Sequence, residues 1–388
     1  MLPRLRSIPG LEISANVPLA AYTRFGMGGP ARLLVDASTE TALAAALHLL
    51  REAGVAHTVI GGGTNVIVSD EGFPGVVLRY TNASIEFPPI KPDVIESGAV
   101  RVGAGAVLQD LVDRTIALGL GGLETLTGIP GWVGGAIYGN AGAYGHSIHE
   151  RIRSVRFLNL ARIGTPDTSF GITINRPACE FGYRDSVFKR NKDWIILGAE
   201  LELDQGVAEE LLKTAAGIRK IRDEKYPPSM RCAGSIFKNL LLAELPEAAR
   251  AQVPEKVIRE GKVPSAYFLE QASAKGMARG GVKVAEYHAN LIYNQGGGTA
   301  RELRELIDEL KQRLVKHGIS VKLSESARRY LLKNGYDPHN GVRPLRRLIQ
   351  ETIEDNVAMS ILDDKVPKGS IISVGINNKE LTYSSTPE

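Results

Sequence analysis

A glycine-rich run at positions 127–145, "TGIPGWVGGAIYGNAGAYG", constrains this chain more than any other feature, and it also contains Trp132, Asn140 and two tyrosines. Glycine lets the backbone adopt positive φ and lets another group approach its N–H closely, but it costs about 0.5–1 kcal/mol relative to alanine in an ordered element. A chain that keeps so much bare backbone between aromatic side chains must obtain a compensating interaction there.

Two further segments are rich in glycine, "TRFGMGGPARLLV" at 23–35 and "GGGTNVIVSDEGF" at 61–73. Consecutive bare N–H groups in such turns can form a concavity that binds the pyrophosphate of a dinucleotide. The first segment matches a loose GxGxxA pattern, but "ARLLVDA" leads it into a strand, whereas a Rossmann site requires the glycines to open a helix. No GxxxxGK[ST] motif occurs, so we reject both the Rossmann and the P-loop interpretations. Glycine turns without a ligand remain the alternative for any one loop.

Composition narrows the class of protein. Of the 388 residues, 43% are hydrophobic and 23% are charged, which is typical of packed domains and predicts two or three of them. A net charge of +4, from 47 basic and 43 acidic residues, is too small to favour nucleic-acid binding. The sequence has no apolar run of about 18 residues that would span a membrane, and it begins without the apolar core of a signal peptide. We therefore expect a cytoplasmic protein.

The cysteines and histidines predict no metal site. Cys179 and Cys232 stand in neither CxxC nor CxxH spacing, and the seven histidines are scattered, so we expect two free thiols and no bound metal. His288, in "YHANLIYN", is expected to pack in the substrate domain rather than to act as a base.

The first half of the chain shows an α+β pattern. The runs "ARLLVDA", "HTVIGGG", "NVIVSD", "GVVLRY", "VRVGAG" and "IILGAELEL" predict strands, and helices are predicted at Glu40–Ala53 and Leu108–Leu118. Residues 207–226 have the apolar spacing of a helix that stops at the following prolines, which predicts a hinge into a second region.

The last part of the chain has a different sequence pattern. "ARELRELIDELKQRLVKHG" predicts a charged amphipathic helix, and "SARRYLLKNG" and "RPLRRLIQETIEDNVAMSILDD" predict two more helices before a strand-like "GSIISVGI".

Two polar segments are candidates for chemistry. "FGYRDSVFKR" carries Tyr183, Arg184 and Asp185 on a short turn or strand, and "CAGSIFKNL" places Ser235 with Lys238 and Asn239 behind a small-residue turn. An arginine can hold a carboxylate with two hydrogen bonds, and a serine hydroxyl can transfer a proton. Each of these side chains could equally be an ordinary satisfied polar group, and spacing alone does not join the two segments.

Together these segments resemble the UDP-N-acetylenolpyruvoylglucosamine reductase (MurB) family of peptidoglycan synthesis. The matching stretches are "TRFGMGGPARLLV", "GGGTNVIVSDEGF", "GIPGWVGGAIYGNAGAYG", "YRDSVFK", "AGSIFKN" and "KVAEYHANLIYNQGGGTARELRELI", which cover about residues 10–315 in the family's order. The resemblance implies a two-lobed FAD-binding domain of the vanillyl-alcohol-oxidase type, followed by an α+β substrate domain. It also implies that the cytoplasmic enzyme, a UDP-N-acetylmuramate dehydrogenase, uses NADPH to reduce UDP-N-acetylglucosamine enolpyruvate through FAD.

The same resemblance assigns roles to individual residues. It implies that Arg184 polarises the substrate carboxylate, that Ser235 donates the proton, and that Tyr183, Lys238 and Asn239 contact the substrate. The residues that it implies for FAD come from two of the glycine-rich segments: Gly61, Gly62, Gly63, Thr64, Asn65, Gly128, Ile129, Pro130, Gly134, Gly135, Asn140, Ala141 and Gly142.

The resemblance breaks after the helix expected at 300–316. The family ends on a motif of the form LEPEVR whose second glutamate completes the catalytic set, whereas this chain reads "HGISVKLSESARRY". Alignment on the preceding residues puts Ser324 at the glutamate position and Glu325 one residue later. A shift of one residue in a strand turns a side chain to the other face, so Glu325 is not counted as catalytic.

Residues 303–375 instead resemble the C-terminal small subdomain of Clp-type AAA+ unfoldases, through "GYDPHNGVRPLRRLIQ" and "IEDNVAMSIL". Arg343 lies where that family's arginine senses ATP, but without a Walker motif we expect it to be a structural or interface charge. The sequence thus predicts an FAD-binding domain at 1–205, a substrate domain at 206–316 and a small, mainly helical module at 317–388, with a junction within 300–323. The alternative function is a catalytically impaired FAD and UDP-sugar-binding fusion, whose terminal module serves self-association.

Overall fold

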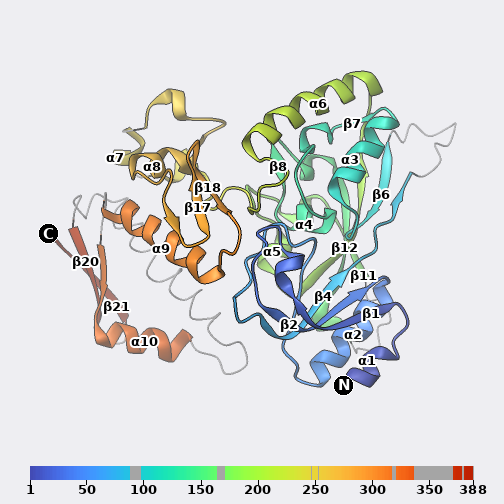
Figure 1. Ribbon diagram of the computed structural model, residues 1–388, viewed down its shortest axis with the longest axis horizontal. Coiled ribbons are helices and arrows are strands. Elements are labelled where there is room, and N and C mark those ends of the chain that lie inside the picture. The colour runs from blue at the N-terminus through green and yellow to red at the C-terminus, as the bar shows by residue number, and fades with distance from the viewer. Residues whose placement is uncertain are drawn as a thin grey trace. The chain divides into compact units, whose positions relative to one another are not determined.

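The computed structural model describes residues 1–87, 98–163, 171–245, 247–251, 253–316, 320–335, 370–377 and 380–387 (Figure 1). Two compact units make up the chain. The first contains Met1–Gly234 and Tyr293–Arg301, and the second contains Ser235–Ile292 and the residues from Glu302 onward, so the chain passes between the units three times. The domain boundaries expected at 205/206 and 316/317 are not tested by this division and stay predictions.

A four-stranded sheet begins the first unit. Its strands β1 (Leu11–Pro18), β2 (Pro30–Ala37), β3 (His57–Val59) and β4 (Phe73–Tyr80) lie in the order β1-β2-β4-β3. The pairs β2/β4 and β3/β4 are parallel, and β1 is antiparallel to β2. Because Pro30 starts a strand, the glycines before it do not open a helix, as the rejection of a Rossmann site requires.

Two helices pack on the core of this unit, α1 (Leu2–Arg6) and α2 (Glu40–Glu52). The side chain of Thr39 caps α2 by accepting a hydrogen bond from the N–H of Ala42 at 3.1 Å. Leu43, Leu47 and Leu50 are fully buried at helical spacing, which is why this segment forms an amphipathic helix.

The second sheet of the first unit is antiparallel throughout. It consists of β5 (Ile85–Glu86), β6 (Ala99–Gly103), β10 (Ile152–Asn159), β11 (Gly171–Asn175) and β12 (Trp194–Glu202), in the order β11-β10-β12-β6-β5. The rings of Phe157 and Trp194 stack at 4.3 Å between centroids, and Phe188 meets Phe157 edge-on at 5.5 Å. These aromatic contacts join β10 and β12 to the short helix α5 (Val187–Arg190).

Three more helices belong to this unit: α3 (Leu108–Ala117), α4 (Val133–Tyr138) and α6 (Ala208–Lys225), of which α6 packs against α3. Two short strand pairs complete it, β7 (Leu120–Gly121) with β13 (Asp204–Gln205) and β8 (Gly142–Ala143) with β9 (His146–Ser147).

A late segment of the chain, 293–301, returns to the first unit. The side-chain amide of Asn294 donates to the carbonyl oxygen of Phe25 at 3.0 Å. The carboxylate of Asp70 accepts from the N–H groups of Ala300 and Arg301 at 2.7 and 2.9 Å, and so caps the start of α9 (Ala300–Lys316). The first unit is therefore completed only by residues that follow the first segment of the second unit, Ser235–Ile292.

The second unit contains a three-stranded sheet, β16 (Ala278–Arg279), β17 (Val282–Ala285) and β18 (His288–Asn294), and a short pair, β14 (Leu240–Leu241) with β15 (Lys262–Val263). Helices α7 (Glu247–Ala251) and α8 (Ser265–Gln271) lie between them in sequence. On α9, Leu303, Leu306 and Leu310 are fully buried, and Glu309 pairs with Arg279 at 2.7 Å, which attaches α9 to the β16–β17 hairpin.

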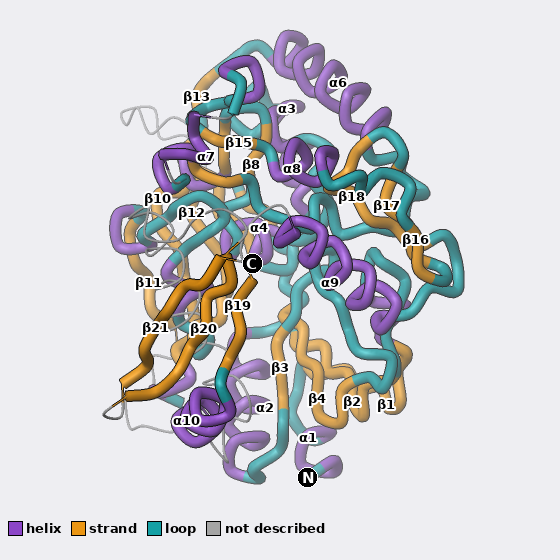
Figure 2. The backbone as a smooth tube through the Cα atoms, turned by 90° about the vertical axis from the view of Figure 1, so that its left-hand side faces the viewer, coloured by secondary structure: helices purple, strands orange, loops and turns teal. Residues whose placement is uncertain are grey.

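The C-terminal part of this unit is a small sheet with one described helix (Figure 2). Strand β19 (Ser320–Leu323) pairs in parallel with β20 (Ser370–Asn377), and β20 pairs antiparallel with β21 (Glu380–Pro387). Helix α10 (Glu325–Gly335) buries Ala327 and Leu331. The helix and strand expected at 326–335 and 369–376 are confirmed, while Arg343 and the helix predicted around it lie outside the described residues.

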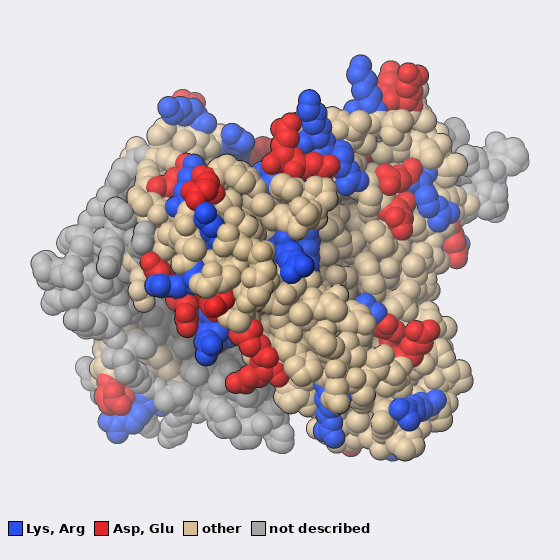
Figure 3. Space-filling view, viewed as in Figure 1, with Lys and Arg blue, Asp and Glu red and all other residues tan. Residues whose placement is uncertain are grey.

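Most of the expected elements of the first unit are present, and the α+β class is confirmed. The predicted strand "NVIVSD" is wrong. The carbonyl of Ser69 does accept from the N–H of Gly29 at 2.8 Å, but it also accepts from the N–H of Gly72 at 2.9 Å, so the segment ends in a turn rather than continuing a ladder. On the face shown in Figure 3, the charged side chains of the described residues lie in scattered groups, most of which contain both acidic and basic residues, in keeping with the small net charge.

Candidate functional site

Two of the glycine-rich loops meet in the first unit. The Thr64 hydroxyl donates to the carbonyl oxygen of Pro130 at 3.2 Å. A Cβ added to Gly131 would lie 2.6 Å from the Thr64 hydroxyl, and one added to Gly62 would lie 3.0 Å from the indole of Trp132. The loops can approach this closely only because both positions lack a side chain.

Gly63 must also be glycine, because of its backbone conformation and a close neighbour. Its φ is +65°, and a Cβ there would stand 1.8 Å from the carbonyl oxygen of Tyr22. The carbonyl oxygen of Gly63 accepts from the N–H of Arg24 at 3.2 Å, which ties the 61–65 loop to the glycine-rich segment before β2.

An ion pair lies against the two aromatic side chains of this site, Tyr22 and Trp132. Arg79 binds Asp36 through two hydrogen bonds, one of them of 2.6 Å between Nε and Oδ1. The Arg79 guanidinium lies 4.7 Å from the ring centroid of Tyr22 and 5.5 Å from that of Trp132. These contacts hold the two rings in place through cation–π attraction.

Helix α4 begins directly after Trp132. The N–H of Gly134 donates to the carbonyl of Ala104 at 2.9 Å, and a Cβ on Gly134 would lie 2.8 Å from the Ala104 Cβ. Gly135 has no atom within 4 Å of its added Cβ, so it faces open space. Gly134 is thus required by packing, whereas Gly135 is exposed and no neighbouring atom requires glycine there.

Asn140 provides a test of whether the site fits a cofactor. Only 5% of the residue is exposed, and its side-chain amide donates to the carbonyl oxygen of Gly182 at 2.8 Å. Its Oδ1 is buried with no hydrogen-bond partner among the described residues. A buried acceptor of this kind costs free energy unless a donor reaches it, so a bound group with a hydrogen-bond donor fits this position.

Arg184 lies beside the same loop. It has a φ of 55°, and its guanidinium donates to the carbonyl oxygens of Asn140 and Gly142 at 3.4 and 2.9 Å. The ammonium of Lys189 donates to the Arg184 carbonyl oxygen at 2.7 Å, and the neighbouring Ser186, fully buried, donates to the carbonyl of Tyr138 at 2.8 Å. The structure therefore brings Arg184 and Tyr183 together with the predicted cofactor residues at 140–142.

The other predicted site residues lie in the second unit. The side chain of Asn290, 2% exposed, accepts from the N–H of Phe237 and donates to its carbonyl oxygen, both at 2.8 Å. Ser235 pairs with Leu291 in an isolated bridge. These contacts hold the "AGSIFKN" segment along β18, and Asn290 is a positioning residue that the sequence analysis missed within "YHANLIYN".

Lys238 and Asn239 contact the start of α8. The carbonyl oxygen of Lys238 accepts from the Ser265 hydroxyl, and Oδ1 of Asn239 accepts from the N–H of Ser265 at 3.3 Å. The Asn239 side chain therefore holds its own segment to the start of α8. Nδ1 of His288 accepts from the N–H of Asn290 at 3.2 Å, a contact within β18.

Ser324 and Glu325 occupy the start of α10. The Ser324 hydroxyl accepts from the N–H of Ala327 at 3.1 Å, so Ser324 is a helix cap. Glu325 is exposed in the first turn, where its negative charge suits the helix dipole. Both side chains thus have structural roles where the resemblance would place a catalytic glutamate.

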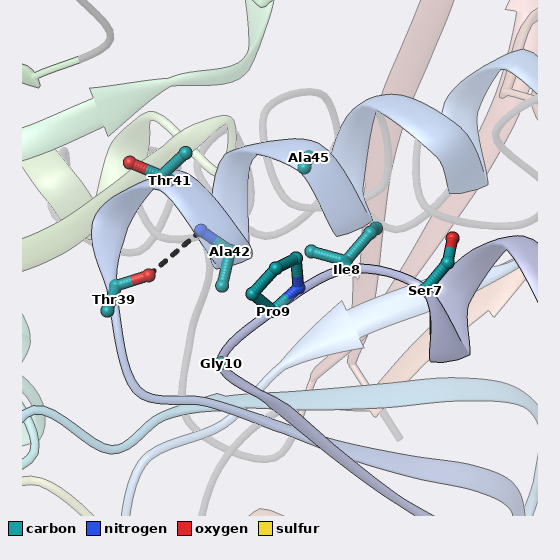
Figure 4. A pocket seen from close by; sticks show the side chains of 8 residues that line it. All are labelled: Ser7, Ile8, Pro9, Gly10, Thr39, Thr41, Ala42 and Ala45. Atoms are coloured by element: carbon teal, nitrogen blue, oxygen red, sulfur yellow. Dashed lines mark hydrogen bonds between the residues drawn. The ribbon is translucent and has the colours of Figure 1, made fainter.

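The other described features that could have formed a site lack catalytic or metal-binding groups. A hollow beside the start of α2 has no charged lining and contains none of the predicted site residues (Figure 4); it is lined by Ser7, Ile8, Pro9, Gly10, Thr39, Thr41, Ala42 and Ala45. Cys179 and Cys232 are buried free thiols as expected, and burial raises the pKa of the Cys179 thiol to about 12. Within the described ranges there is no cluster of three potential metal ligands and no helix that could cross a membrane.

Before any relative is considered, the site already has the features of a ligand-binding site. Two glycine loops lie beside aromatic side chains, and a buried acceptor has no hydrogen-bond partner among the described residues. Residues 31–162 match the family model described as an FAD binding domain. The first unit therefore contains an FAD-binding domain at 31–162, and the FAD-binding fold implied by the resemblance is confirmed.

The remaining comparisons identify the family. Residues 226–330 match the C-terminal domain of UDP-N-acetylenolpyruvoylglucosamine reductase. The reductase of that name from Solibacter usitatus is 55% identical over 320 residues, which are 82% of this chain and 97% of the relative, and that from Carboxydothermus hydrogenoformans is 36% identical over 317 residues. The crystal structure of the Thermus caldophilus enzyme aligns with a TM-score of 0.58 and 27% identity over 78% of this chain and 94% of its own. The chain belongs to the UDP-N-acetylenolpyruvoylglucosamine reductase family.

A second family is present at the C-terminus. Residues 300–374 match the C-terminal D2-small domain of ClpB protein, and this range overlaps the reductase match from 300 to 330. Both resemblances found in the sequence are confirmed, and α9 lies in the overlap.

Proposed function

We propose that this chain reduces UDP-N-acetylglucosamine enolpyruvate to UDP-N-acetylmuramate in the cytoplasm, as a step of peptidoglycan synthesis, with NADPH as the reductant. The observation that carries this proposal is the convergence of the glycine loops with Arg184 in an FAD-binding domain that belongs to this family.

FAD would be held by the backbone at 61–65 and 128–142, with the unpartnered Oδ1 of Asn140 as an acceptor for one of its donors. When bound, FAD carries the hydride from NADPH to the enolpyruvyl double bond. The chain's own part is to position the substrate and to stabilise the charge that develops on it.

Arg184 is proposed to bind the enolpyruvyl carboxylate. Hydride addition to the double bond leaves negative charge on the adjacent carbon, and the carboxylate accepts this charge in an enolate-like form. A guanidinium beside that carboxylate stabilises the charge, and the two backbone carbonyls that already accept from Arg184 fix its orientation. Tyr183 beneath it, 5.9 Å from the guanidinium to the ring centroid, supports the same placement.

Ser235 is proposed to give its hydroxyl proton to the carbon of the enolate, which completes the reduction. The backbone of its segment is fixed to β18 through Asn290. Lys238 and Asn239, in the same segment, are proposed as substrate contacts.

A second function is favoured by one observation. Because Ser324 caps α10 and Glu325 is exposed in its first turn, neither side chain is assigned the role of the family's terminal glutamate. The chain would then bind FAD and UDP-sugar without efficient turnover, and its C-terminal module, 317–388, would serve self-association.

Visible spectra of the purified full-length protein distinguish the two functions. Under anaerobic conditions NADPH should bleach the flavin, and UDP-N-acetylglucosamine enolpyruvate should restore its absorbance. Flavin that bleaches and does not recover contradicts the reductase and supports the second function. Ser235→Ala should bleach normally and recover slowly, while the exposed Ser229→Ala should behave as wild type.

A further inference from the structure

The turn that carries Arg184 contains two residues in the left-handed backbone region. Glu180 has a φ of 45° and Arg184 a φ of 55°, although neither is glycine. Between them, the N–H of Gly182 donates to the carbonyl oxygen of Asp185 at 3.1 Å, and the N–H of Asp185 donates to that of Gly182 at 3.2 Å. A side chain makes the left-handed region unfavourable, and such residues persist where the surrounding structure holds them in place. The 180–185 turn therefore needs contacts that fix its conformation.

Arg190 contacts both ends of this turn. Its Nη2 pairs with the Glu180 carboxylate and its Nη1 pairs with the Asp185 carboxylate, each at 2.5 Å. Glu180 is itself one of the left-handed residues, and Asp185 directly follows the other. One guanidinium therefore bridges the two left-handed positions, which its several N–H donors in a fixed plane allow. We call these two ion pairs the Arg190 bridge.

Arg190 is the last residue of α5, and this short helix is fixed to the core. Phe188 is fully buried, and its ring meets that of Phe157 edge-on at 5.5 Å. The Ser186 hydroxyl caps the helix by accepting from the N–H of Lys189 at 3.3 Å. Because these contacts do not involve the 180–185 turn, α5 gives the arginine a base that is independent of the turn it binds.

The bland interpretation of Arg190 is an ordinary surface ion pair. Its side chain is 44% exposed, and isolated exposed pairs contribute little to stability. Arg156 is such a case, because its side chain is 45% exposed and binds the carboxylate of Glu40, in α2. Arg190 differs in that it joins two carboxylates of one turn, and this turn contains a proposed substrate-binding arginine.

We propose that Arg190 is a positioning residue for Arg184. By binding Glu180 and Asp185 together, it holds the turn in the conformation from which the Arg184 guanidinium reaches the carbonyl oxygens of the 140–142 loop. The consequence for catalysis rests on the proposed function, in which Arg184 binds the substrate carboxylate. The bridge itself does not depend on turnover, so it can be tested separately.

Hydrogen exchange of the full-length protein, followed by mass spectrometry, tests the bridge. Loss of two partly exposed ion pairs should make the peptide that contains residues 181–186 exchange about threefold to tenfold faster in Arg190→Gln. Arg156→Gln is the matched control, because it removes an ion pair of an equally exposed arginine from the same unit. Equal exchange of this peptide in the two variants would overturn the proposal, whatever the enzymatic activity.

Substrate binding tests the connection to Arg184. UDP-N-acetylglucosamine enolpyruvate is titrated into the oxidised FAD-loaded protein with flavin absorbance as the readout, and stopped-flow spectra follow reduction by NADPH. Arg190→Gln should weaken substrate affinity by about threefold to tenfold and leave the reduction by NADPH as in Arg156→Gln. Arg190→Lys should recover part of the affinity, because it keeps the charge without the planar guanidinium.

The double variant separates positioning from a general structural effect. If Arg190 acts through Arg184, then Arg190→Gln should weaken substrate binding no further in the Arg184→Ala background. Additive losses would contradict the proposal, and so would a loss of affinity in Arg184→Ala that Arg190→Gln does not share. If exchange of the turn rises and neither variant changes substrate affinity, the bridge is supported and the role of Arg184 in the proposed function is wrong.

Discussion

Replacing Gly63 with alanine tests the link between the 61–65 loop and FAD. The added Cβ would lie 1.8 Å from the carbonyl oxygen of Tyr22, so backbone must move, because no side-chain rotation can relieve the contact. The substituted residue must also keep a φ of +65°, which L side chains rarely adopt.

The magnitude follows from these two effects. A left-handed conformation costs about 1–2 kcal/mol for a residue with a Cβ. Displacement of the loop also removes the hydrogen bond from Arg24 N–H to the Gly63 carbonyl, worth about 0.5–1.5 kcal/mol. If this total of about 1.5–3.5 kcal/mol falls on the FAD-bound form, FAD affinity drops by roughly 10-fold to 300-fold.

The assay is a fluorescence titration of the FAD-free variant with FAD. Gly61→Ala is the matched control from the same loop, because its added Cβ would have no contact closer than 3.9 Å. We expect Gly61→Ala to bind FAD much as wild type does. Equal FAD affinity in the two variants would refute the assignment of this loop to the cofactor.

Three further outcomes are expected. Arg184→Ala should retain FAD and be reduced by NADPH, while the substrate-dependent reoxidation measured by stopped-flow slows by about tenfold or more, and Arg184→Lys should recover part of the rate. Asn290→Ala should lower the free energy of unfolding by about 1–3 kcal/mol, measured by urea denaturation, because it leaves the Phe237 N–H and carbonyl unpaired. The Cys179 thiol, with a pKa raised to about 12 by burial, should remain protonated and unreactive toward a thiol reagent at pH 8 and react only after unfolding; rapid reaction of the folded protein at both cysteines would contradict this.

Local patterns predicted the helices well. The helices α2, α6 and α9 each have apolar residues at helical spacing, and α6 also has a recognisable stop in the prolines that follow it. The strand "ARLLVDA" was equally clear. In contrast, "NVIVSD" has the alternation of a strand, but forming a strand also requires a ladder partner, which is a property of the tertiary structure.

The residues of the candidate site were predicted only where they stand in a recognisable motif. The glycine loops and Arg184 stand in recognisable stretches, and the structure places them together. The i, i+3 spacing of Arg219 and Arg222 indicates that they share a face of α6, but only the fold reveals that both lie beside Gly128. Glu325, left out of the catalytic set on the basis of strand register, proved to be in the first turn of a helix.

The return of residues 293–301 to the first unit sets the order in which the nascent chain can fold. The hydrogen bond from Asn294 to Phe25 spans 269 residues. The N–H groups that Asp70 accepts from, those of Ala300 and Arg301, are also synthesised long after Asp70 itself. While the ribosome is still synthesising the substrate segment, the FAD-binding unit lacks its final contacts. Domains usually fold in turn as they emerge from the ribosome, but here the first must remain incomplete until the first segment of the second, Ser235–Ile292, has been made. A ribosome stalled before residue 293 would therefore carry an unfinished cofactor domain, even though the glycine-rich segments at 23–35, 61–73 and 127–145 have already been made.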